Sequence, residues 1–297
     1  MARPRLKKST NSHGEPTPPR SGSDSHEGNR PFALPRHLVD FLAANSAFTL
    51  EEFLEADEES GRKRSGTVKL LKRYVALGYV TSARRGLYWV SNERLDHFLV
   101  AMKLAEDVVL AYEGAAGFHE LLTLQYQLHF LTAHQMRHFA LDEVIFQPVR
   151  AANPRSEQHV QKVERNGHLF YVTTRERTLV DLLDRFDSTT DLSRLWYGFR
   201  TAGPLDSRAM LSYSKRLDRS LTYARLGLFL ANLPGHGQVA RQLEWLVSST
   251  RQYLQRRRRS RWNGDEKPKD EGPIEFVPRF NLFVPREFLL DLERRNL

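Results

Sequence analysis

The chain has 297 residues, of which 40% are hydrophobic and 27% charged, and its formal net charge is +9. This composition is typical of globular proteins and excludes a wholly disordered chain. The lack of cysteine excludes disulfide scaffolds, thiol nucleophiles and cysteine-ligated zinc sites. The basic surplus favours a polyanionic partner if the charge is clustered.

Membrane and export signals are weak in this sequence. No apolar run approaches the roughly 18 residues of a membrane-spanning helix, and no apolar signal-peptide core follows the basic N-terminus. We therefore expect a cytoplasmic protein with no membrane partner. Residues 1–30 are rich in Ser, Pro, Gly and charge. Such a segment buries too little apolar surface to offset its ordering entropy, so we expect a disordered basic tail, either solvated or touching DNA phosphates.

Residues 31–95 are predicted to contain three helices. The first covers residues 36–44, where apolar side chains recur at helical spacing. Thr49 and Glu52 have the spacing of a capping box at the start of a second, short helix. The third helix is expected over residues 65–77, where its own apolar positions follow the same helical period.

A β-hairpin is predicted directly after the third helix. Gly78 stands where a helix C-cap glycine is expected. Residues 79–81 and 87–90 are rich in β-forming side chains and surround a polar turn. Three helices followed by a hairpin are typical of a winged helix-turn-helix, whose third helix enters the major groove of DNA.

Charge is divided unevenly within this domain. Residues 31–59 hold one basic and seven acidic residues, whereas residues 60–90 hold eight basic residues and no acid. The basic half contains the third helix and the wing, which are the elements that meet DNA in this architecture. An ordinary surface helix with solvated lysines is the alternative interpretation.

The candidate DNA contacts come from this basic half. We expect Ser65, Lys69 and Arg73 to reach base edges and the other cations to bind phosphates. Leu71, with Val68 and Val75, is expected to pack on the first two helices. The full candidate set is Lys63, Arg64, Ser65, Thr67, Lys69, Lys72, Arg73, Arg84 and Arg85.

Residues 96–297 are predicted to form a larger mixed α+β domain with a modest sheet and many helices. A long helical pattern is expected over residues 99–131. An Asn-Gly pair at 166–167 predicts a hairpin between two strands. Thr173 or Thr174 is expected to cap the helix that follows. The remaining elements expected are strands at 144–146, 159–163 and 168–172, helices at 192–199, 207–217, 221–230 and 239–254, an exposed Arg-rich loop at about 255–272, and a final strand and helix.

Three segments in order resemble one family. Residues 172–183 are similar to the "v-t-x-x-E-R-T-L-x-D" signature of AbiEi-type antitoxins, and residues 223–230 resemble that family's "R-L-G-y-L-L" helix. The N-terminal domain resembles the winged helix of the same family. Residues 116–119 are similar to a further motif but lack its usual His-Gly order. The resemblance spans about residues 35–235.

This resemblance implies a transcriptional regulator with two roles. Its N-terminal domain would bind inverted repeats in double-stranded operator DNA of its own promoter. Its C-terminal domain would counteract a cognate nucleotidyltransferase toxin, directly or indirectly. We expect the motif residues to be structural, with Arg177 and Asp181 paired one helical turn apart. The motif residues are Glu176, Arg177, Thr178, Asp181, Arg225 and Gly227.

Catalytic and metal sites are weighed as alternatives. Carboxylates such as Glu176 and Asp181 each have an arginine nearby in sequence, which favours salt bridges over acid–base catalysis. Arg225 is a further candidate partner for them. His134 and His138 have the spacing of two zinc ligands on an expected helix, but no third ligand is evident. We therefore expect a protein that is not an enzyme, without cofactor or metal.

Two other functions remain open from the sequence. The first is a free-standing transcriptional regulator whose C-terminal domain senses a ligand or mediates assembly. The second is a DNA-processing enzyme that uses the winged helix for targeting. The operator sequence, the toxin, the oligomeric state, and the roles of the N-terminal tail and of the run 256–261 are not determined by the sequence.

Overall fold

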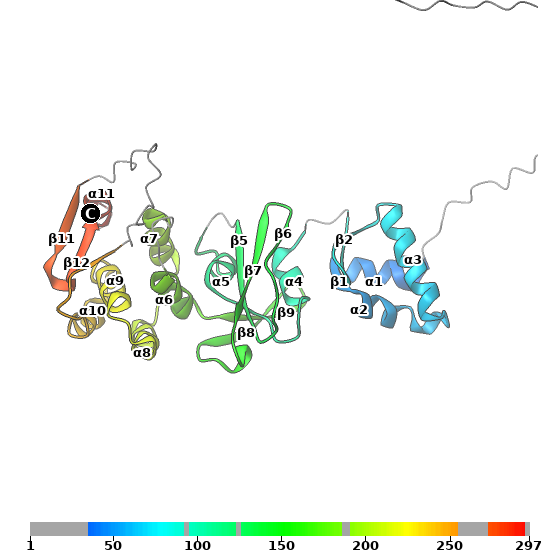
Figure 1. Cartoon of the computed structure of the whole chain (residues 1–297), viewed down its shortest axis with the longest axis horizontal. Coiled ribbons are helices and arrows are strands. Elements are labelled where there is room, and N and C mark those ends of the chain that lie inside the picture. Colours follow the sequence, from blue (N-terminus) through cyan, green and yellow to red (C-terminus); the bar gives the residue numbers. More distant parts are fainter. Residues whose placement is uncertain (1–34, 92–94, 123–125, 186–190, 255–272, 295–297) are drawn as a thin grey trace, which may run out of the picture.

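The computed structural model describes residues 35–91, 95–122, 126–185, 191–254 and 273–294. These residues form eleven α-helices and twelve strands in three sheets, which confirms the expected α+β class. Figure 1 shows three groups of elements in sequence along the longest axis: a helical group, a central sheet and a second helical group. The predicted N-terminal tail lies outside the described residues.

The first group is a winged helix-turn-helix, as predicted. The Thr49–Glu52 capping box is present with both hydrogen bonds, and Gly78 has the left-handed φ of +77° that ends a helix. One short strand that the sequence did not indicate pairs with the hairpin in the order β1-β3-β2. The elements are α1 (Arg36–Ala44), β1 (Ala47–Thr49), α2 (Leu50–Ala56), η1 (Glu58–Ser60), α3 (Arg64–Ala76), β2 (Val80–Arg84) and β3 (Leu87–Val90).

The inner face of α3 differs from the predicted one. Leu71 is buried as expected, but its buried companions are Thr67 and Tyr74, whereas Val68 and Val75 are only half-buried. The reason is that Tyr74 enters the aromatic core of this group, with its ring 6.0 Å from that of Phe53 on α2. A large aromatic side chain buries more apolar area than a valine and so sets the rotation of the helix.

The central group is a mixed six-stranded sheet in the order β6-β7-β5-β4-β9-β8. Strands β5 and β7 pair in parallel, as do β4 and β9, and the other neighbours are antiparallel. The predicted turn at Asn166 and Gly167 is confirmed by φ values of +52° and +74°. The elements are α4 (His97–Met102), β4 (Val109–Leu110), α5 (Tyr112–Phe118), β5 (Gln127–Thr132), β6 (Phe139–Leu141), β7 (Val144–Arg150), η2 (Pro154–Ser156), β8 (Val160–Arg165) and β9 (His168–Thr173).

The prediction of a continuous helical pattern over residues 99–131 is wrong. This stretch holds two short helices and the strands β4 and β5. Val109 and Leu110 are completely buried in the middle of the sheet. A strand covered on both faces is apolar at every position, so its sequence lacks the alternation that distinguishes a strand from a buried helix.

The third group is mainly helical. Thr174 caps its first helix, because its hydroxyl accepts a hydrogen bond from the Arg177 amide at 3.3 Å. The small sheet has the order β10-β12-β11. The elements are α6 (Arg175–Arg185), α7 (Leu192–Thr201), α8 (Ser207–Leu217), α9 (Ser220–Ala231), α10 (Gly237–Glu244), β10 (Gln252–Tyr253), β11 (Ile274–Val277), η3 (Pro278–Phe280), β12 (Leu282–Pro285) and α11 (Arg286–Arg294).

Two predictions for the C-terminal region need correction. The expected helix over 239–254 ends at Glu244, and the expected last strand is two strands joined by a 3₁₀ turn. The predicted final helix after Pro285 is confirmed. The predicted Arg-rich loop at about 255–272 lies outside the described residues. No described helix has both the length and the apolarity to span a membrane.

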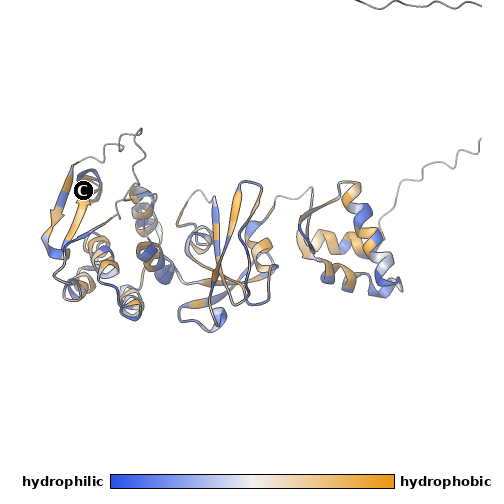
Figure 2. Ribbon diagram, viewed as in Figure 1, coloured by the Kyte–Doolittle hydropathy of each residue, from blue (hydrophilic) through white to orange (hydrophobic). Residues whose placement is uncertain are grey.

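Each of the three groups has its own buried core, but the groups are joined. Ala47 and Leu87 of the winged helix are buried in the apolar core of the central sheet, together with Phe130 and Phe146. Figure 2 shows hydrophobic residues concentrated where elements of each group face one another. The winged helix is therefore packed on the central part through the outer side of its small sheet.

Gly227, in the segment 223–230 that resembles the antitoxin family, has a packing role. A Cβ atom at Gly227 on α9 would lie 2.5 Å from the ring of Phe280, which is 1% exposed. Real Cβ atoms do not come so close to another atom, and a buried ring has little room to move. Gly227 therefore allows the segment between β11 and β12 to lie against α9.

We expect Gly227→Ala to lower the free energy of unfolding by about 1–3 kcal/mol, because overpacking strains a dense core. The measurement is urea denaturation followed by circular dichroism. Gly237→Ala, at the start of α10, is the matched control, because no described atom lies within 4 Å of its Cβ position. If the two variants unfold at the same urea concentration, Gly227 has no packing role.

Candidate functional site

The exposed face of α3 collects cationic side chains. Lys69, Lys72 and Arg73 are exposed on this helix, with Ser65 near its start. Figure 2 shows hydrophilic colour over much of the α3 ribbon. Lys63, at the N-cap position, is also exposed. The predicted base-reading and phosphate-binding residues of the helix thus share one solvent-facing surface.

Arg64 is held by an acidic neighbour on α2. Its guanidinium donates two hydrogen bonds to the Glu51 carboxylate, at 3.0 and 2.7 Å. The hydrogen bond from Arg64 lowers the pKa of Glu51. Both side chains are about two-thirds exposed, at 65% and 64%. Exposed ion pairs contribute little to stability, so a phosphate can replace Glu51 at small cost.

Thr67 does not belong to the exposed face, which corrects the candidate set. It is 2% exposed, and its hydroxyl donates to Asp57 Oδ2 at 2.6 Å. Asp57 Oδ1 also accepts from Arg62 Nη1 at 2.6 Å and from His37 Nε2 at 2.9 Å. Burial opposes the charge of Asp57, but these hydrogen bonds outweigh it and lower its pKa. Asp57, which the sequence did not single out, thus fixes α3 to α1 and to the preceding turn.

The two wing arginines have different surroundings. The Arg84 guanidinium lies 5.2 Å from the centre of the Phe139 ring on β6. Arg85 is exposed at the tip of the hairpin, beside Gly86 with its φ of +81°. Lys103 after α4 pairs with Glu52 on α2 and further ties the two groups together. Arg84 therefore lies at the contact with the central sheet, and Arg85 is the better placed for a phosphate.

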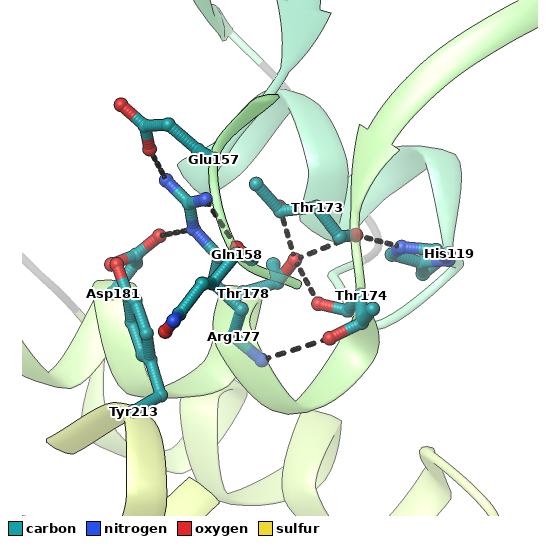
Figure 3. Close-up of polar contacts among 9 residues, drawn as sticks. All are labelled: His119, Glu157, Gln158, Thr173, Thr174, Arg177, Thr178, Asp181 and Tyr213. Atoms are coloured by element: carbon teal, nitrogen blue, oxygen red, sulfur yellow. Dashed lines mark hydrogen bonds and ion pairs between the residues drawn. The ribbon is translucent and has the colours of Figure 1, made fainter. Parts of the chain in front are cut away.

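The first family-like segment builds a buried polar cluster around Arg177, shown in Figure 3. The guanidinium donates to Glu157 Oε2 at 2.5 Å, to the Gln158 carbonyl at 2.7 Å and to Asp181 Oδ2 at 3.3 Å. The Tyr213 hydroxyl donates to Asp181 Oδ1 at 2.7 Å. The predicted pairing of Arg177 with Asp181 is thus confirmed. The cluster joins α6, α8 and the turn before β8.

Thr178 and His119 complete the same region (Figure 3). The Thr178 hydroxyl donates to the Thr174 carbonyl at 2.7 Å and lies 2.7 Å from the Thr173 hydroxyl. His119 Nε2 lies 2.7 Å from the Thr173 carbonyl, and because a carbonyl only accepts, Nε2 carries the proton. Burial lowers the pKa of His119. These groups attach α6 to the end of β9, a structural role.

The other two motif charges bind the backbone. Glu176 Oε1 accepts from the Asp206 amide at 3.2 Å, just before α8. The prediction that Arg225 pairs with Glu176 or Asp181 is wrong. Arg225 is 1% exposed and donates to the carbonyls of Leu183 and Leu254, at 2.5 and 2.9 Å. It therefore joins the C-terminal end of α6, where intrahelical partners run out, to the residue that follows β10.

The described residues give no support to a metal site. Among them, no group of three or more His, Asp or Glu side chains is arranged to hold an ion. His134 and His138 lie between β5 and β6 in a stretch that is not helical, so the predicted helical spacing does not apply. His134 Nε2 instead lies 3.8 Å from Asp107 Oδ1.

Asp181 is a buried acid whose pKa is raised by its surroundings. Burial raises its pKa from 3.8 to about 6, although Arg177 and Tyr213 act in the opposite direction. At neutral pH the carboxylate is still ionised and paired with Arg177. Burial also raises the pKa of Tyr213, so its hydroxyl remains a donor. The cluster is therefore a satisfied ion pair and not a proton-transfer pair.

The variant Asp181→Asn tests whether the pKa of Asp181 is raised in the folded protein. Folded Asp181 binds its proton more tightly than the unfolded chain, so the ionisation of this group reduces stability as pH rises from about 4 to about 6. The variant does not titrate and keeps an acceptor for Tyr213. We expect the stability of the native chain, relative to Asp181→Asn, to fall across this range in urea denaturation. A constant or rising difference would contradict the raised pKa.

Comparisons with known proteins identify the fold only. No family model and no curated protein matches the chain. Among solved structures, the chain is similar to the RV2827C protein from Mycobacterium tuberculosis, with 15% sequence identity and a TM-score of 0.58. The likeness covers 87% of this chain and 93% of that one. It therefore extends beyond the winged helix to the parts that follow, but at this identity it says nothing about activity.

Proposed function

We propose that the protein is a sequence-specific DNA-binding regulator that represses its own operon and serves as the antitoxin of a nucleotidyltransferase-type toxin. The observation that supports DNA binding best is the exposed face of α3, where Lys69, Lys72 and Arg73 extend from a winged helix-turn-helix. In this architecture the third helix lies in the major groove and the wing contacts the backbone.

The placement of charge supports the same proposal. Arg64 extends the cationic surface at the start of α3, and its exposed partner Glu51 is the acid that a phosphate would displace. Exposed Arg85 at the wing tip supplies a second contact, from a different element. Two separated phosphate contacts fix the register of a helix in the groove, which base reading requires.

The antitoxin role rests on the resemblance of two segments to the AbiEi family. In this chain Arg177, Asp181 and Arg225 of these segments are buried and bonded to one another or to backbone. These residues maintain the fold of the C-terminal part. A surface that acts against a toxin, if the two proteins touch, must therefore be made by other residues of this part.

A ligand-sensing regulator is the second candidate function. It is favoured by a polar cavity between α6 and α9, in the part of the chain that does not contact DNA in the proposal above. The two candidates differ in whether the chain protects cells from a toxin. The gene of a nucleotidyltransferase next to that of this chain would favour the first.

DNA reading is tested by fluorescence anisotropy on the chain's own upstream DNA and on scrambled DNA, across a range of salt. We expect Lys69→Ala or Arg73→Ala to cost about 1–3 kcal/mol on the upstream DNA and to reduce its preference over scrambled DNA. Arg85→Ala should weaken both DNAs equally and reduce the salt slope. Arg84→Ala should have a smaller effect, because Arg84 lies against Phe139.

Arg241→Ala, an exposed arginine on α10, is the control for a general loss of positive charge. It should leave the binding of both DNAs unchanged. Equal losses for Lys69→Ala, Arg73→Ala and Arg241→Ala would show that binding is only electrostatic and would overturn the docking of α3 in the groove.

The antitoxin role is tested by co-expression with the neighbouring nucleotidyltransferase. We expect the native chain to restore growth, and Arg85→Ala to do so as well if neutralisation is independent of DNA binding. Growth arrest despite soluble native chain would reject the antitoxin role and leave the DNA-binding proposal untouched.

A further inference from the structure

A polar cavity of about 930 Å³ lies where α6 ends and α9 begins. The segment that leads from α10 to β10 forms its remaining wall. Its volume is within the range of pockets that hold small molecules, roughly 300–1,000 Å³. Its lining residues are Asp184, Arg185, Arg219, Ser220, Leu221, Thr222, Arg225, Ser248, Thr250 and Gln252.

The charges of the lining are unbalanced in favour of cations. Among the lining residues that the structure describes, three are arginines, Arg185, Arg219 and Arg225, and one is a carboxylate, Asp184. They come from the end of α6, from the residue before α9 and from the interior of α9, so they surround the cavity and do not form a stripe on one surface. A concave site with a positive surplus favours an anionic ligand.

Asp184 offsets only one of the positive charges of the lining, and both of its oxygens are already hydrogen-bonded. Oδ2 accepts from Arg219 Nη1 at 2.6 Å, and Oδ1 accepts from the Thr222 hydroxyl at 2.6 Å. The side chain of Asp184 is 10% exposed, whereas that of Arg219 is 64% exposed. Asp184 therefore positions the guanidinium, whose other N–H groups are available to the cavity.

Hydroxyl groups supply the rest of the polar lining. Ser220 accepts from the Ser248 amide and from Gln252 Nε2, both at 2.8 Å, which fixes the cavity wall. Thr250 is exposed on the same wall. The first turn of α9 also belongs to the lining, and the partial positive charge of a helix start adds to that of the arginines. The Ser220 and Thr222 hydroxyls donate to Ser248 and to Asp184, so the guanidinium groups and the Thr250 hydroxyl are the donors that a phosphate would use.

We propose that this cavity binds a phosphate monoester of nucleotide size. The phosphate group lies between Arg219 and Arg185, and the remaining volume accommodates the group esterified to it. Arg185 also stacks on the Tyr112 ring, with its guanidinium carbon 3.9 Å from the ring centre. This contact holds the cation at the cavity edge. The proposal is independent of DNA binding by α3.

The test is isothermal titration calorimetry of the full chain with adenosine 5′-monophosphate, inorganic phosphate and adenosine. We expect the monophosphate to bind, inorganic phosphate to bind more weakly, and adenosine not to bind. If inorganic phosphate binds as tightly as the monophosphate, the cavity binds phosphate but the assignment of a nucleotide-sized ligand is overturned. Adenosine binding as tightly as its monophosphate, or no binding of either phosphate compound, would overturn the proposal.

Variants of two neighbouring residues locate the site. Thr250→Glu places a carboxylate in the cavity wall, and we expect it to weaken monophosphate binding about tenfold or more. Thr250→Gln introduces a side chain of nearly the same shape as glutamate but without the charge, and it should retain most of the affinity. Ser249→Glu adds the same charge at an exposed residue that does not line the cavity, and should change affinity by less than about threefold.

The two glutamate variants distinguish a cavity site from surface binding. Circular dichroism melting curves that match the native chain show that each variant is folded. Equal losses in Thr250→Glu and Ser249→Glu would mean that the anion is attracted by the surface as a whole, which would overturn the cavity. We expect Thr250→Glu to bind DNA with native affinity whatever the outcome of the titration. Failure of the phosphate-site proposal can therefore be distinguished from failure of the DNA-binding proposal.

Discussion

The burial of Arg177 is the constraint on which the second half of the molecule depends. A guanidinium that is 3% exposed is stable only if its hydrogen bonds and its charge are both satisfied. Here Glu157 and Asp181 supply the charge and the Gln158 carbonyl supplies a further acceptor. These partners come from the turn before β8 and from α6. The central sheet and the helical group therefore cannot separate without taking Glu157 and the Gln158 carbonyl away from the Arg177 guanidinium.

The winged helix uses the same principle on a smaller scale. Asp57 is buried with three donors that approach from α1, from the turn and from α3. Because Thr67 is one of them, the rotation of α3 about its axis is fixed, and with it the set of side chains that faces solvent. The Thr67–Asp57 contact and the burial of Tyr74 together thus determine which side chains form the external cationic face. Lys69, Lys72 and Arg73 are exposed because Thr67, Leu71 and Tyr74 are not.

Local sequence patterns predicted those features that depend on residues close together in the chain, such as helix caps and ion pairs one helical turn apart. The capping box at Thr49, the helix-ending Gly78 and the pairing of Arg177 with Asp181 each involve residues within four positions of one another. Long-range partners could not be predicted in this way. Arg225 donates to the Leu254 carbonyl, 29 residues away, and the sequence contains no signal for a backbone acceptor. The buried β4 was missed for the related reason that burial on both faces removes its alternation.

The contrast between buried and exposed arginines separates fold from function in the C-terminal part. Arg177 and Arg225 belong to the segments that resemble a family, yet both donate hydrogen bonds to backbone carbonyls inside the protein. Arg219 carries none of the resemblance, but its guanidinium is held by Asp184 at the edge of a cavity. The motif residues that resemble the family are thus those that stabilise the fold. Contacts with a ligand are made in our proposal by exposed neighbours such as Arg219. The buried arginines of α6 and α9 hold the helices that position these neighbours.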